Sequence, residues 1–279
     1  HPYHTKIPPS AIQAYILRYT KPGDIVLDPF CGSGMTGVAA ARTGRRAILG
    51  DLSPAAVHIA RNYTEPCDAV AFRSAVKRVL ARAGSEIRAL YTTEHNGESA
   101  TIESMVWSDV RECPRCRHSF ALWDQRHEGL RRLLCPACGE EGPKAAFVFT
   151  GEKAVEVNLS LPGRRRITRE PREEEARPAS LPEPMPWFPT VEFGPNRPMW
   201  RRAHADLGIR TVADFFSRRN LAALGLLWDA AADEPDPRLR DALRFSLTAI
   251  INRASRRYQW NPKRPTNVLG GTLYVSSLR

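Results

Sequence analysis

The feature that most constrains this chain is the stretch Ile25–Thr36, in which an apolar run, an aspartate and two glycines follow one another. The residues Ile25–Leu27 predict a short strand covered on both faces, because such apolar runs are typical of parallel sheets. Asp28 stands at the tip of that strand. Gly32 and Gly34 lack the Cβ atoms that would keep a ligand away from the backbone, and a helix with free N–H groups is expected to follow.

A second strand is expected at Ala47–Gly50, and Asp51 follows it directly. At the carboxyl edge of a parallel sheet this aspartate is placed for the ribose hydroxyls of a nucleotide-like ligand. Asp28 precedes the first glycine, where it would repel a phosphate and suit a cation. S-adenosylmethionine, with its adenosine, positive sulfonium and amino-acid tail, therefore fits better than a dinucleotide. The alternative is a glycine turn in some other α/β protein.

Residues 28–34, D-P-F-C-G-S-G, resemble the cofactor motif of the amino-group DNA methyltransferases, which modify adenine N6 or cytosine N4. Residues 1–9, H-P-Y-H-T-K-I-P-P, loosely match a segment upstream of that motif which also contacts the cofactor. The chain most resembles the adenine-specific DNA methylases that carry an inserted zinc ribbon. The resemblance implies an S-adenosylmethionine site formed by Tyr3, Thr5, Lys6, Asp28, Pro29, Phe30, Gly32, Ser33, Gly34, Thr36, Asp51 and Leu52.

Two C-P-x-C pairs, Cys113/Cys116 and Cys135/Cys138, are separated by eighteen residues. This spacing is typical of a four-thiolate zinc site, and the segments 120–123 and 131–134 are expected to be the strands of a zinc ribbon. Disulfides are the competing interpretation, but no signal peptide is visible. Four thiolates leave no open position on the metal, so the zinc is expected to be structural.

The fold expected is α/β: a partial Rossmann-like methyltransferase sheet with an inserted zinc ribbon and a helical region. Two strands cannot make a stable sheet of this kind, so later segments are expected to complete it. The chain starts inside a motif and ends in a strand-like segment, as a fragment of a longer protein would. The expected regions are 1–66 for the cofactor-binding half, 67–104 for a basic helix and connection, 105–150 for the zinc ribbon, 151–200 for a Pro/Arg/Glu-rich linker, and 201–279 for helices leading back to the methyltransferase domain.

The formal charge of +11 and a pI near 9.8 suit a polyanionic partner, although an arginine-rich proteome would raise both values. Double-stranded DNA with a flipped base is the partner that the resemblance implies. No apolar run is long enough to span a membrane. The expected location is the cytoplasm of a prokaryote, on the nucleoid when DNA is bound. Direct nucleic-acid contact is expected from Arg253, Arg256, Arg257, Tyr258, Trp260, Lys263 and Arg264, with core packing and solvated arginines as an equal alternative.

The catalytic motif of the family, Asp/Asn-Pro-Pro-Tyr/Phe, is absent from these 279 residues. Asp236-Pro237 opens a helix, and Asn261-Pro262 lacks the second proline and the aromatic residue. The catalytic residues are therefore unknown, and the motif is expected beyond Arg279. The fragment by itself is expected to bind the cofactor weakly and not to methylate. Cys67 is the one candidate thiolate for cytosine-C5 chemistry, and nothing around it indicates activation.

Three functions are consistent with these features. The first is an amino-group DNA methyltransferase that acts on adenine N6, a target taken from the resemblance alone. The second is an RNA methyltransferase, because the same fold and tetrapeptide serve RNA. The third is a non-catalytic protein that binds DNA through its zinc ribbon and basic helices.

Overall fold

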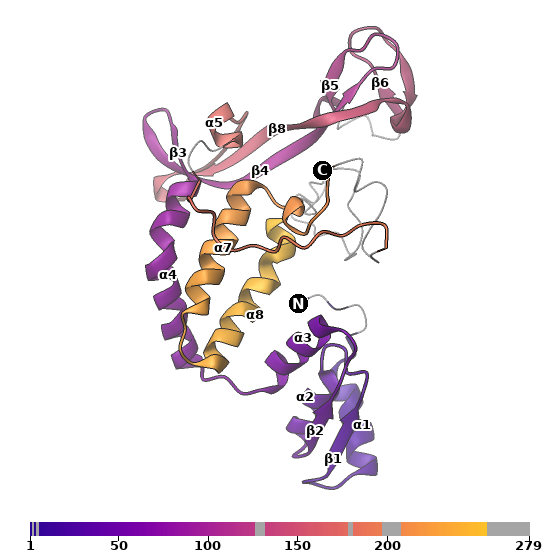
Figure 1. Ribbon diagram of the computed structural model, residues 1–279, viewed down its shortest axis with the longest axis vertical. Coiled ribbons are helices and arrows are strands. Elements are labelled where there is room, and N and C mark those ends of the chain that lie inside the picture. Colours follow the sequence, from indigo (N-terminus) through magenta and orange to yellow (C-terminus); the bar gives the residue numbers. More distant parts are fainter. Residues whose placement is uncertain (2, 4–5, 126–131, 178–180, 197–207, 256–279) are drawn as a thin grey trace. The chain divides into compact units, whose positions relative to one another are not determined.

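The computed structural model describes residues 1, 3, 6–125, 132–177, 181–196 and 208–255 (Figure 1). The chain forms two compact units. The first holds His1–Arg82 and Leu227–Ile251, and the second holds Ala83–Leu226 and the described residues from Asn252. Part of the helical region 201–279, which is expected from the sequence to lead back to the methyltransferase domain, thus belongs to the N-terminal unit.

The first unit begins with helix, strand, helix, strand and helix, and this order contains the predicted strand, helix and strand. β1 and β2 pair in parallel, with Asp28 opposite Leu49. Helices α1 and α2 cover one face of this pair through a small core that includes Ile16, Ala39 and Val26. The elements are α1 (Pro9–Tyr19), β1 (Ile25–Asp28), α2 (Met35–Arg42), β2 (Arg46–Leu49) and α3 (Pro54–Thr64).

The other face of β1 and β2 is open. Ile25 is 51% exposed, Leu27 67% and Ile48 56%, and Leu27 and Ile48 are paired across the two strands. The expectation that β1 is covered on both faces is therefore wrong for the residues that the structure describes. No later strand in these residues extends the pair, since the remaining strands belong to two antiparallel sheets.

Three longer helices complete the described helical part: α4 (Ala69–Tyr91), α7 (Arg218–Ala232) and α8 (Pro237–Ala254). Arg78 and Arg82 of α4 form ion pairs with Glu234 and Asp233. These pairs place carboxylates beside two of the cations of the expected basic helix. None of the helices in the described ranges combines the length and apolar character that crossing a membrane requires.

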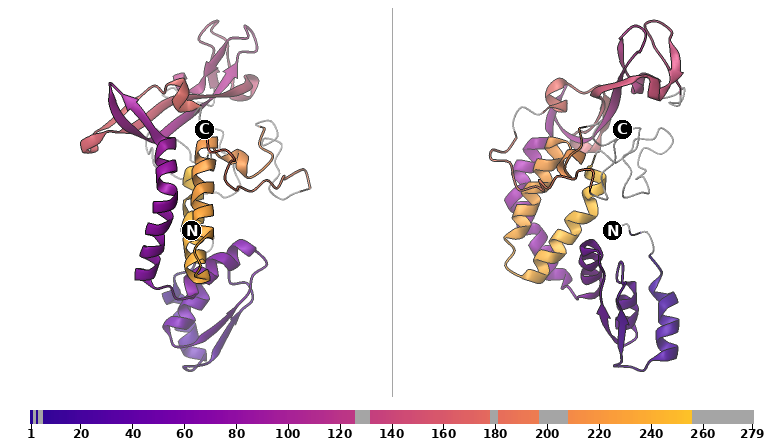
Figure 2. Two further views of the ribbon diagram at one scale, coloured as in Figure 1. Left: turned by 60° about the vertical axis from the view of Figure 1, so that its left-hand side comes forward. Right: turned by 45° about the vertical axis from the view of Figure 1, so that its right-hand side comes forward.

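In the second unit, β4 and β8 are long antiparallel strands that run side by side toward the cysteine-bearing tip (Figures 1 and 2). Their sheet has the order β3-β4-β8-β9, with β5 also paired to β4, and β6 and β7 form a separate pair. The strands are β3 (Thr92–His95), β4 (Glu98–Glu112), β5 (Ser119–Ala121), β6 (Arg132–Leu134), β7 (Glu141–Pro143), β8 (Val148–Ser160) and β9 (Arg166–Arg169). Short 3-10 turns lie at Leu122–Gln125, Lys144–Ala146, Pro162–Arg164 and Ala213–Phe215.

Residues 151–200, expected to be a linker with one possible strand at 154–161, contain that strand as the end of β8 and further ordered structure. They include most of β8, all of β9 and the short helix α5 (Glu173–Ala176). Glu175 of α5 is only 2% exposed, and it accepts hydrogen bonds from Arg169 at 2.8 Å and from Thr93 at 2.6 Å. A buried, paired carboxylate ties this segment to the antiparallel sheet, so the Glu- and Arg-rich composition here supports folding rather than solvation.

Candidate functional site

The turn between β1 and α2 is shaped by its two glycines. Gly32 and Gly34 have φ values of 51° and 76°, in the left-handed region that favours glycine. A Cβ on Gly34 would lie 2.7 Å from the Cα of Ala60 in α3, and one on Gly32 would lie 2.9 Å from Cε1 of Tyr3. The turn is therefore enclosed between α3 and Tyr3, and a side chain at either position would displace one of them.

Two carboxylates lie at the carboxyl ends of the adjacent parallel strands. Asp51 accepts a hydrogen bond from the N–H of Gly32 at its Oδ2 and one from the N–H of Ser53 at its Oδ1, both at 2.9 Å. The N–H groups of Ser53 and Gly32 lower the pKa of Asp51, so it is ionised at neutral pH. Asp28 accepts from the N–H of Phe30 at 3.1 Å. The structure thus brings Asp28, Asp51 and the glycine turn together at one edge.

Apolar side chains flank the same edge. Phe30 is 86% exposed and Leu52 is 99% exposed, which is unusual for residues of their size. Cys31 lies between them in the sequence and is buried. Burial raises the pKa of the Cys31 thiol, and the Asp51 and Asp28 carboxylates raise it further, so this thiol is not an activated nucleophile.

The remaining predicted cofactor residues are distributed unevenly. Ser33 is buried within the turn. Thr36 lies in the first turn of α2 and is half-buried. The Nζ of Lys6 donates to the hydroxyl of Tyr63 at 2.9 Å and lies 4.3 Å from the centre of that ring. Thr5 lies outside the described residues. Pro29 is exposed beside Asp28.

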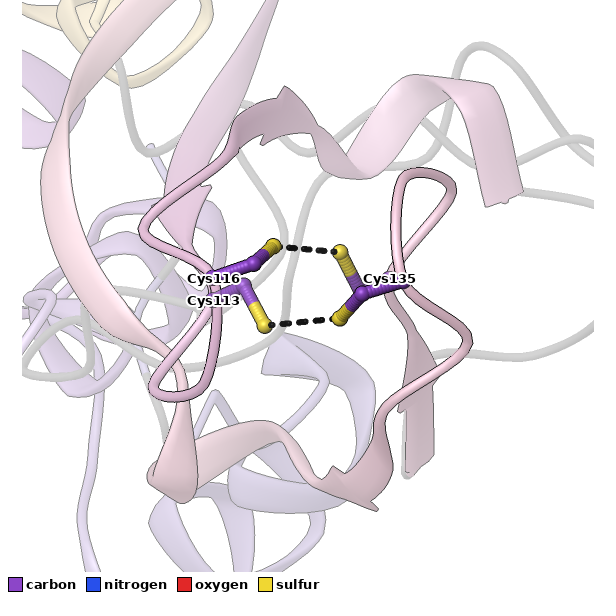
Figure 3. A group of neighbouring side chains, drawn as sticks. Cys113, Cys116 and Cys135 are labelled. Atoms are coloured by element: carbon purple, nitrogen blue, oxygen red, sulfur yellow. Dashed lines mark hydrogen bonds between the residues drawn. The ribbon is translucent and has the colours of Figure 1, made fainter.

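The second candidate site is the cluster of four cysteines, Cys113, Cys116, Cys135 and Cys138. Their sulfur atoms lie within 4.8 Å of one another, with 3.7 Å between Cys113 and Cys138 and 3.6 Å between Cys116 and Cys135 (Figure 3). Four thiolates about 2.3 Å from a tetrahedral zinc ion would be about 3.8 Å apart. A disulfide would need about 2.05 Å. The sulfur geometry therefore fits a tetrahedral metal and not a pair of disulfides.

The two cysteine loops have the same backbone conformation. In each, the residue after the second cysteine donates its N–H to the carbonyl of the first: Arg117 to Cys113 and Gly139 to Cys135, both at 3.0 Å. Arg117 and Gly139 have φ values of 63° and 71°. Burial acts to raise the pKa of the Cys135 thiol, but the N–H groups of Ala137 and Cys138 donate to its sulfur and lower the pKa to about 7. Backbone N–H groups act to lower the pKa of the Cys138 and Cys116 thiols as well, but burial and hydrogen bonds among the cysteines raise the pKa of Cys138 to about 12 and that of Cys116 above its ordinary value. The sulfur separations, and not these pKa values, therefore indicate metal binding.

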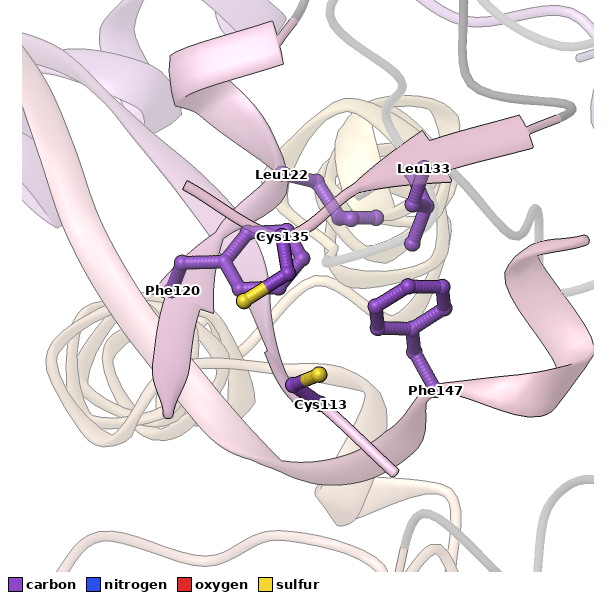
Figure 4. Close-up of a cluster of buried hydrophobic side chains, with 6 residues drawn as sticks. All are labelled: Cys113, Phe120, Leu122, Leu133, Cys135 and Phe147. Carbon is purple, nitrogen blue, oxygen red and sulfur yellow. The ribbon is translucent and has the colours of Figure 1, made fainter. Parts of the chain in front are cut away.

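A small apolar core supports the cluster (Figure 4). Phe120 and Phe147 meet edge to face with their ring centres 5.7 Å apart. Leu122 and Leu133 are almost fully buried with them. These few apolar side chains form a core too small to stabilise an independent fold, and a bound metal would supply the missing stabilisation.

The four described arginines of the ribbon are all paired with carboxylates. The pairs are Arg111 with Asp109, Arg115 with Glu140, Arg117 with Glu112, and Arg132 with Glu141. A surface whose cations already face anions attracts a phosphate backbone weakly. Of the residues expected to contact nucleic acid, Arg253 lies in the last turn of α8, and the other six lie outside the described residues.

Sequence reasoning missed a contribution from α8. Its Phe245 and Thr248 contact His1, which is 247 residues away from Thr248 in the sequence. The periodicity of α8 indicated only a core helix, and no local pattern could have indicated a contact over that separation.

Comparison with known proteins finds similarity in the N-terminal part of the chain. A family model described as DNA methylase matches residues 1–62. The chain is 48% identical over 65 residues to the type II methyltransferase M2.DpnII of Streptococcus pneumoniae, covering 23% of this chain and 24% of that protein. It is 43% identical over 68 residues to the type II methyltransferase M.Cfr9I of Citrobacter freundii, covering 24% of this chain and 23% of the relative.

A third relative is the type II methyltransferase M.MjaII of Methanocaldococcus jannaschii, 41% identical over 54 residues, which are 19% of this chain and 10% of that protein. The chain thus spans about a quarter or less of the length of these relatives. No solved structure matches it. The matched residues contain the glycine turn and both carboxylates of the candidate cofactor site.

Proposed function

We propose that this chain, whose residues 1–62 belong to the amino-group DNA methyltransferase family, binds S-adenosylmethionine at the turn between β1 and α2. We further propose that the protein to which it belongs transfers the methyl group to an exocyclic amino group of a DNA base, adenine N6 by resemblance. The observation that carries the proposal is the joint placement of Asp28, Asp51 and the turn of Gly32 and Gly34 at one strand edge.

Each group at this edge would have a distinct part in binding. The two backbone N–H bonds to Asp51 leave its oxygens with further lone pairs, which can accept hydrogen bonds from ribose hydroxyls. Asp28 supplies negative charge suited to a cation, and the exposed Phe30 and Leu52 supply apolar surface for a purine. The chemistry available at the site is then that of a sulfonium-activated methyl group, and the protein's contribution is orientation.

DNA is the proposed substrate because the relatives over residues 1–62 are named type II methyltransferases within a DNA methylase family. An exocyclic amine in a duplex lies within the base stack, so the target base would have to be flipped out. The paired arginines of the ribbon disfavour a non-catalytic protein that binds DNA through that element. We place the protein in the prokaryotic cytoplasm, on the nucleoid.

We also propose that the four cysteines hold a structural zinc ion. The separation of their sulfurs and the matched cysteine loops support a tetrahedral site, and four thiolates occupy every position of such a metal. The metal would then contribute to folding rather than to methyl transfer.

The cofactor site is tested with Asp51→Asn, in isothermal titration of the chain with S-adenosylmethionine. An amide nitrogen in place of one oxygen would face a backbone N–H, so we expect affinity to fall at least tenfold. Asp236→Asn is the matched control, because Asp236 also accepts from backbone N–H groups, at Arg238 and Leu239, but lies at the start of α8. Equal affinities for the two variants would contradict the assignment.

The reaction is tested with radiolabelled S-adenosylmethionine and the full-length protein, offered duplex DNA or RNA of the same sequence. We expect label in DNA only, on adenine N6, and none from the 279-residue chain by itself because the catalytic tetrapeptide is absent. Label in RNA alone would support the RNA methyltransferase instead. The absence of label from both nucleic acids would contradict both enzymatic functions.

A further inference from the structure

Helix α8 contacts the first residue of the chain. The ring of His1 stacks on Phe245, with 4.0 Å between ring centres and 19° between planes. The hydroxyl of Thr248 donates to the carbonyl of Phe245 at 3.0 Å. Its oxygen can then accept a bond from Nε2 of His1, which lies 2.8 Å away, while Nε2 of His58 lies farther from the same oxygen, at 3.4 Å. In Figure 1 the marked N-terminus lies beside α3 and α8.

The anchored end leads directly to the glycine turn. Tyr3 follows His1 by two residues, which limits its reach to roughly 7 Å from the anchor. Its ring lies against Gly32, where an added Cβ would be 2.9 Å away. The N–H of Gly32 in turn donates to Asp51. A continuous series of contacts thus joins α8, His1, Tyr3, the turn and the carboxylate.

We propose that Phe245 and Thr248 are positioning residues for the cofactor site: they hold His1 so that Tyr3 closes over the glycine turn. The inference rests on the proposed binding of S-adenosylmethionine at that turn. The apolar spacing of α8 predicts only a core helix. The inference gives α8 a further role in cofactor affinity, which acts through His1 and Tyr3.

Other contacts hold α8 independently of His1. The guanidinium of Arg238 donates to the side chain of Asn62 at 2.9 Å and to the carbonyls of Glu65 and Pro66 at 2.8 and 3.0 Å. Asp241 lies 3.4 Å from Arg61. Because these bonds lie at the beginning of α8, a change at Thr248 should release the N-terminal residues without detaching the helix.

The experiment compares Thr248→Val with Thr248→Ser in the whole chain. Valine removes the hydroxyl at nearly constant volume, and serine retains it. Ser246→Ala is the matched control, because the hydroxyl of Ser246 donates within α8, to Ala242. Affinity for S-adenosylmethionine is measured by isothermal titration, and the melting temperature is recorded for each variant. We expect three- to tenfold weaker binding for valine, and wild-type binding for serine and for the Ser246 control.

A double-mutant cycle separates positioning from general destabilisation. If Thr248 acts through Tyr3, then Thr248→Val should have no further effect on affinity in a Tyr3→Ala background. Additive losses, or an affinity of Thr248→Val within twofold of wild type, would overturn the inference.

A readout without ligand distinguishes failure of the inference from failure of the proposed function. Hydrogen exchange of the backbone amide of Gly32, which donates to Asp51 beside the ring of Tyr3, should be faster in Thr248→Val than in the Ser246 control. Faster exchange in a chain that binds no S-adenosylmethionine would support the anchor and defeat the cofactor assignment. Unchanged exchange with normal cofactor binding would defeat the anchor alone.

Discussion

At Gly34 the backbone has a φ of 76°, and the place of a Cβ lies 2.7 Å from both Cα and Cβ of Ala60. Two costs therefore coincide at one residue: a left-handed conformation and an overlap with the backbone of α3. Gly23 has a similar φ of 89° but nothing within 4 Å of its Cβ position. Comparing substitutions at the two glycines therefore separates the cost of the left-handed backbone from the cost of the overlap with α3.

We expect Gly34→Ala to lower the free energy of unfolding by about 2–4 kcal/mol, from strain and displaced packing together. Gly23→Ala should cost only about 1 kcal/mol, from conformation. Urea unfolding followed by circular dichroism measures both. Equal losses for the two variants would show that the contact with Ala60 contributes nothing.

Glu175 shows how a buried carboxylate can respond to pH. Burial acts to raise its pKa, but hydrogen bonds from Arg169, Thr93 and the N–H of Arg172 hold the pKa at about 2, below the ordinary 4.5. The charged form is thus favoured by folding. Its contribution to stability is complete above pH 4.5 and is lost as the pH falls toward 2, by about 3 kcal/mol in total.

We expect the urea midpoint to fall between pH 4.5 and 2, and to fall less in Glu175→Gln, which is already destabilised at pH 7. Glu174→Gln is the control, since the Glu174 side chain is 64% exposed. A pH profile of Glu175→Gln parallel to that of the wild type would refute this role.

At the scale of elements, we expect the four-cysteine segment to depend on the proposed zinc ion more than on its apolar core. Removal of zinc with a chelator should unfold the segment from Met105 to Phe149, because four unliganded sulfurs and a few buried side chains cannot hold it. The checks are loss of ellipticity together with zinc release, measured colorimetrically. Cys67→Ser, which changes an exposed thiol outside the cluster, should behave as the wild type. Unchanged circular dichroism and no released zinc would defeat the proposal.

Element types followed from local patterns where those patterns were strong. Ser53-Pro54 predicts a capped helix over 54–63, and the apolar spacing of 69–90 predicts another; α3 and α4 agree with these ranges to within a residue, and the Ser53 side chain caps α3. The alternating residues 100–110 predict a strand, and β4 contains it. The polar residues 92–99 predict a turn, but Asn96-Gly97 is a typical two-residue hairpin turn and these residues form β3 and the start of β4. Their polar side chains concealed this part of the hairpin.

At the scale of the whole molecule, the formal net charge of +11 suits a polyanionic partner. The described arginines of the ribbon are paired, whereas the basic, aromatic segment from Arg256 to Arg264 lies outside the described residues and is assigned to DNA by sequence alone. We expect Arg256→Gln with Arg257→Gln to weaken binding of duplex DNA severalfold and to reduce its salt dependence. Arg117→Gln should change the affinity by less than twofold. Fluorescence anisotropy across a salt series measures both, and the reverse ranking would move the DNA contact to the ribbon.

The sequence by itself determined the glycine turn, the two carboxylates at adjacent strand ends and the four-cysteine set, because each depends on residues close together in the chain. Only the tertiary structure decided that one face of β1 and β2 is open, that Glu175 is buried, and that Leu227–Ile251 joins the N-terminal unit. These features arise from contacts over tens to hundreds of residues, which no local periodicity encodes. The glycine turn illustrates both: its residues could be found from the sequence, but its enclosure by Tyr3, and the anchoring of His1 on α8, could not.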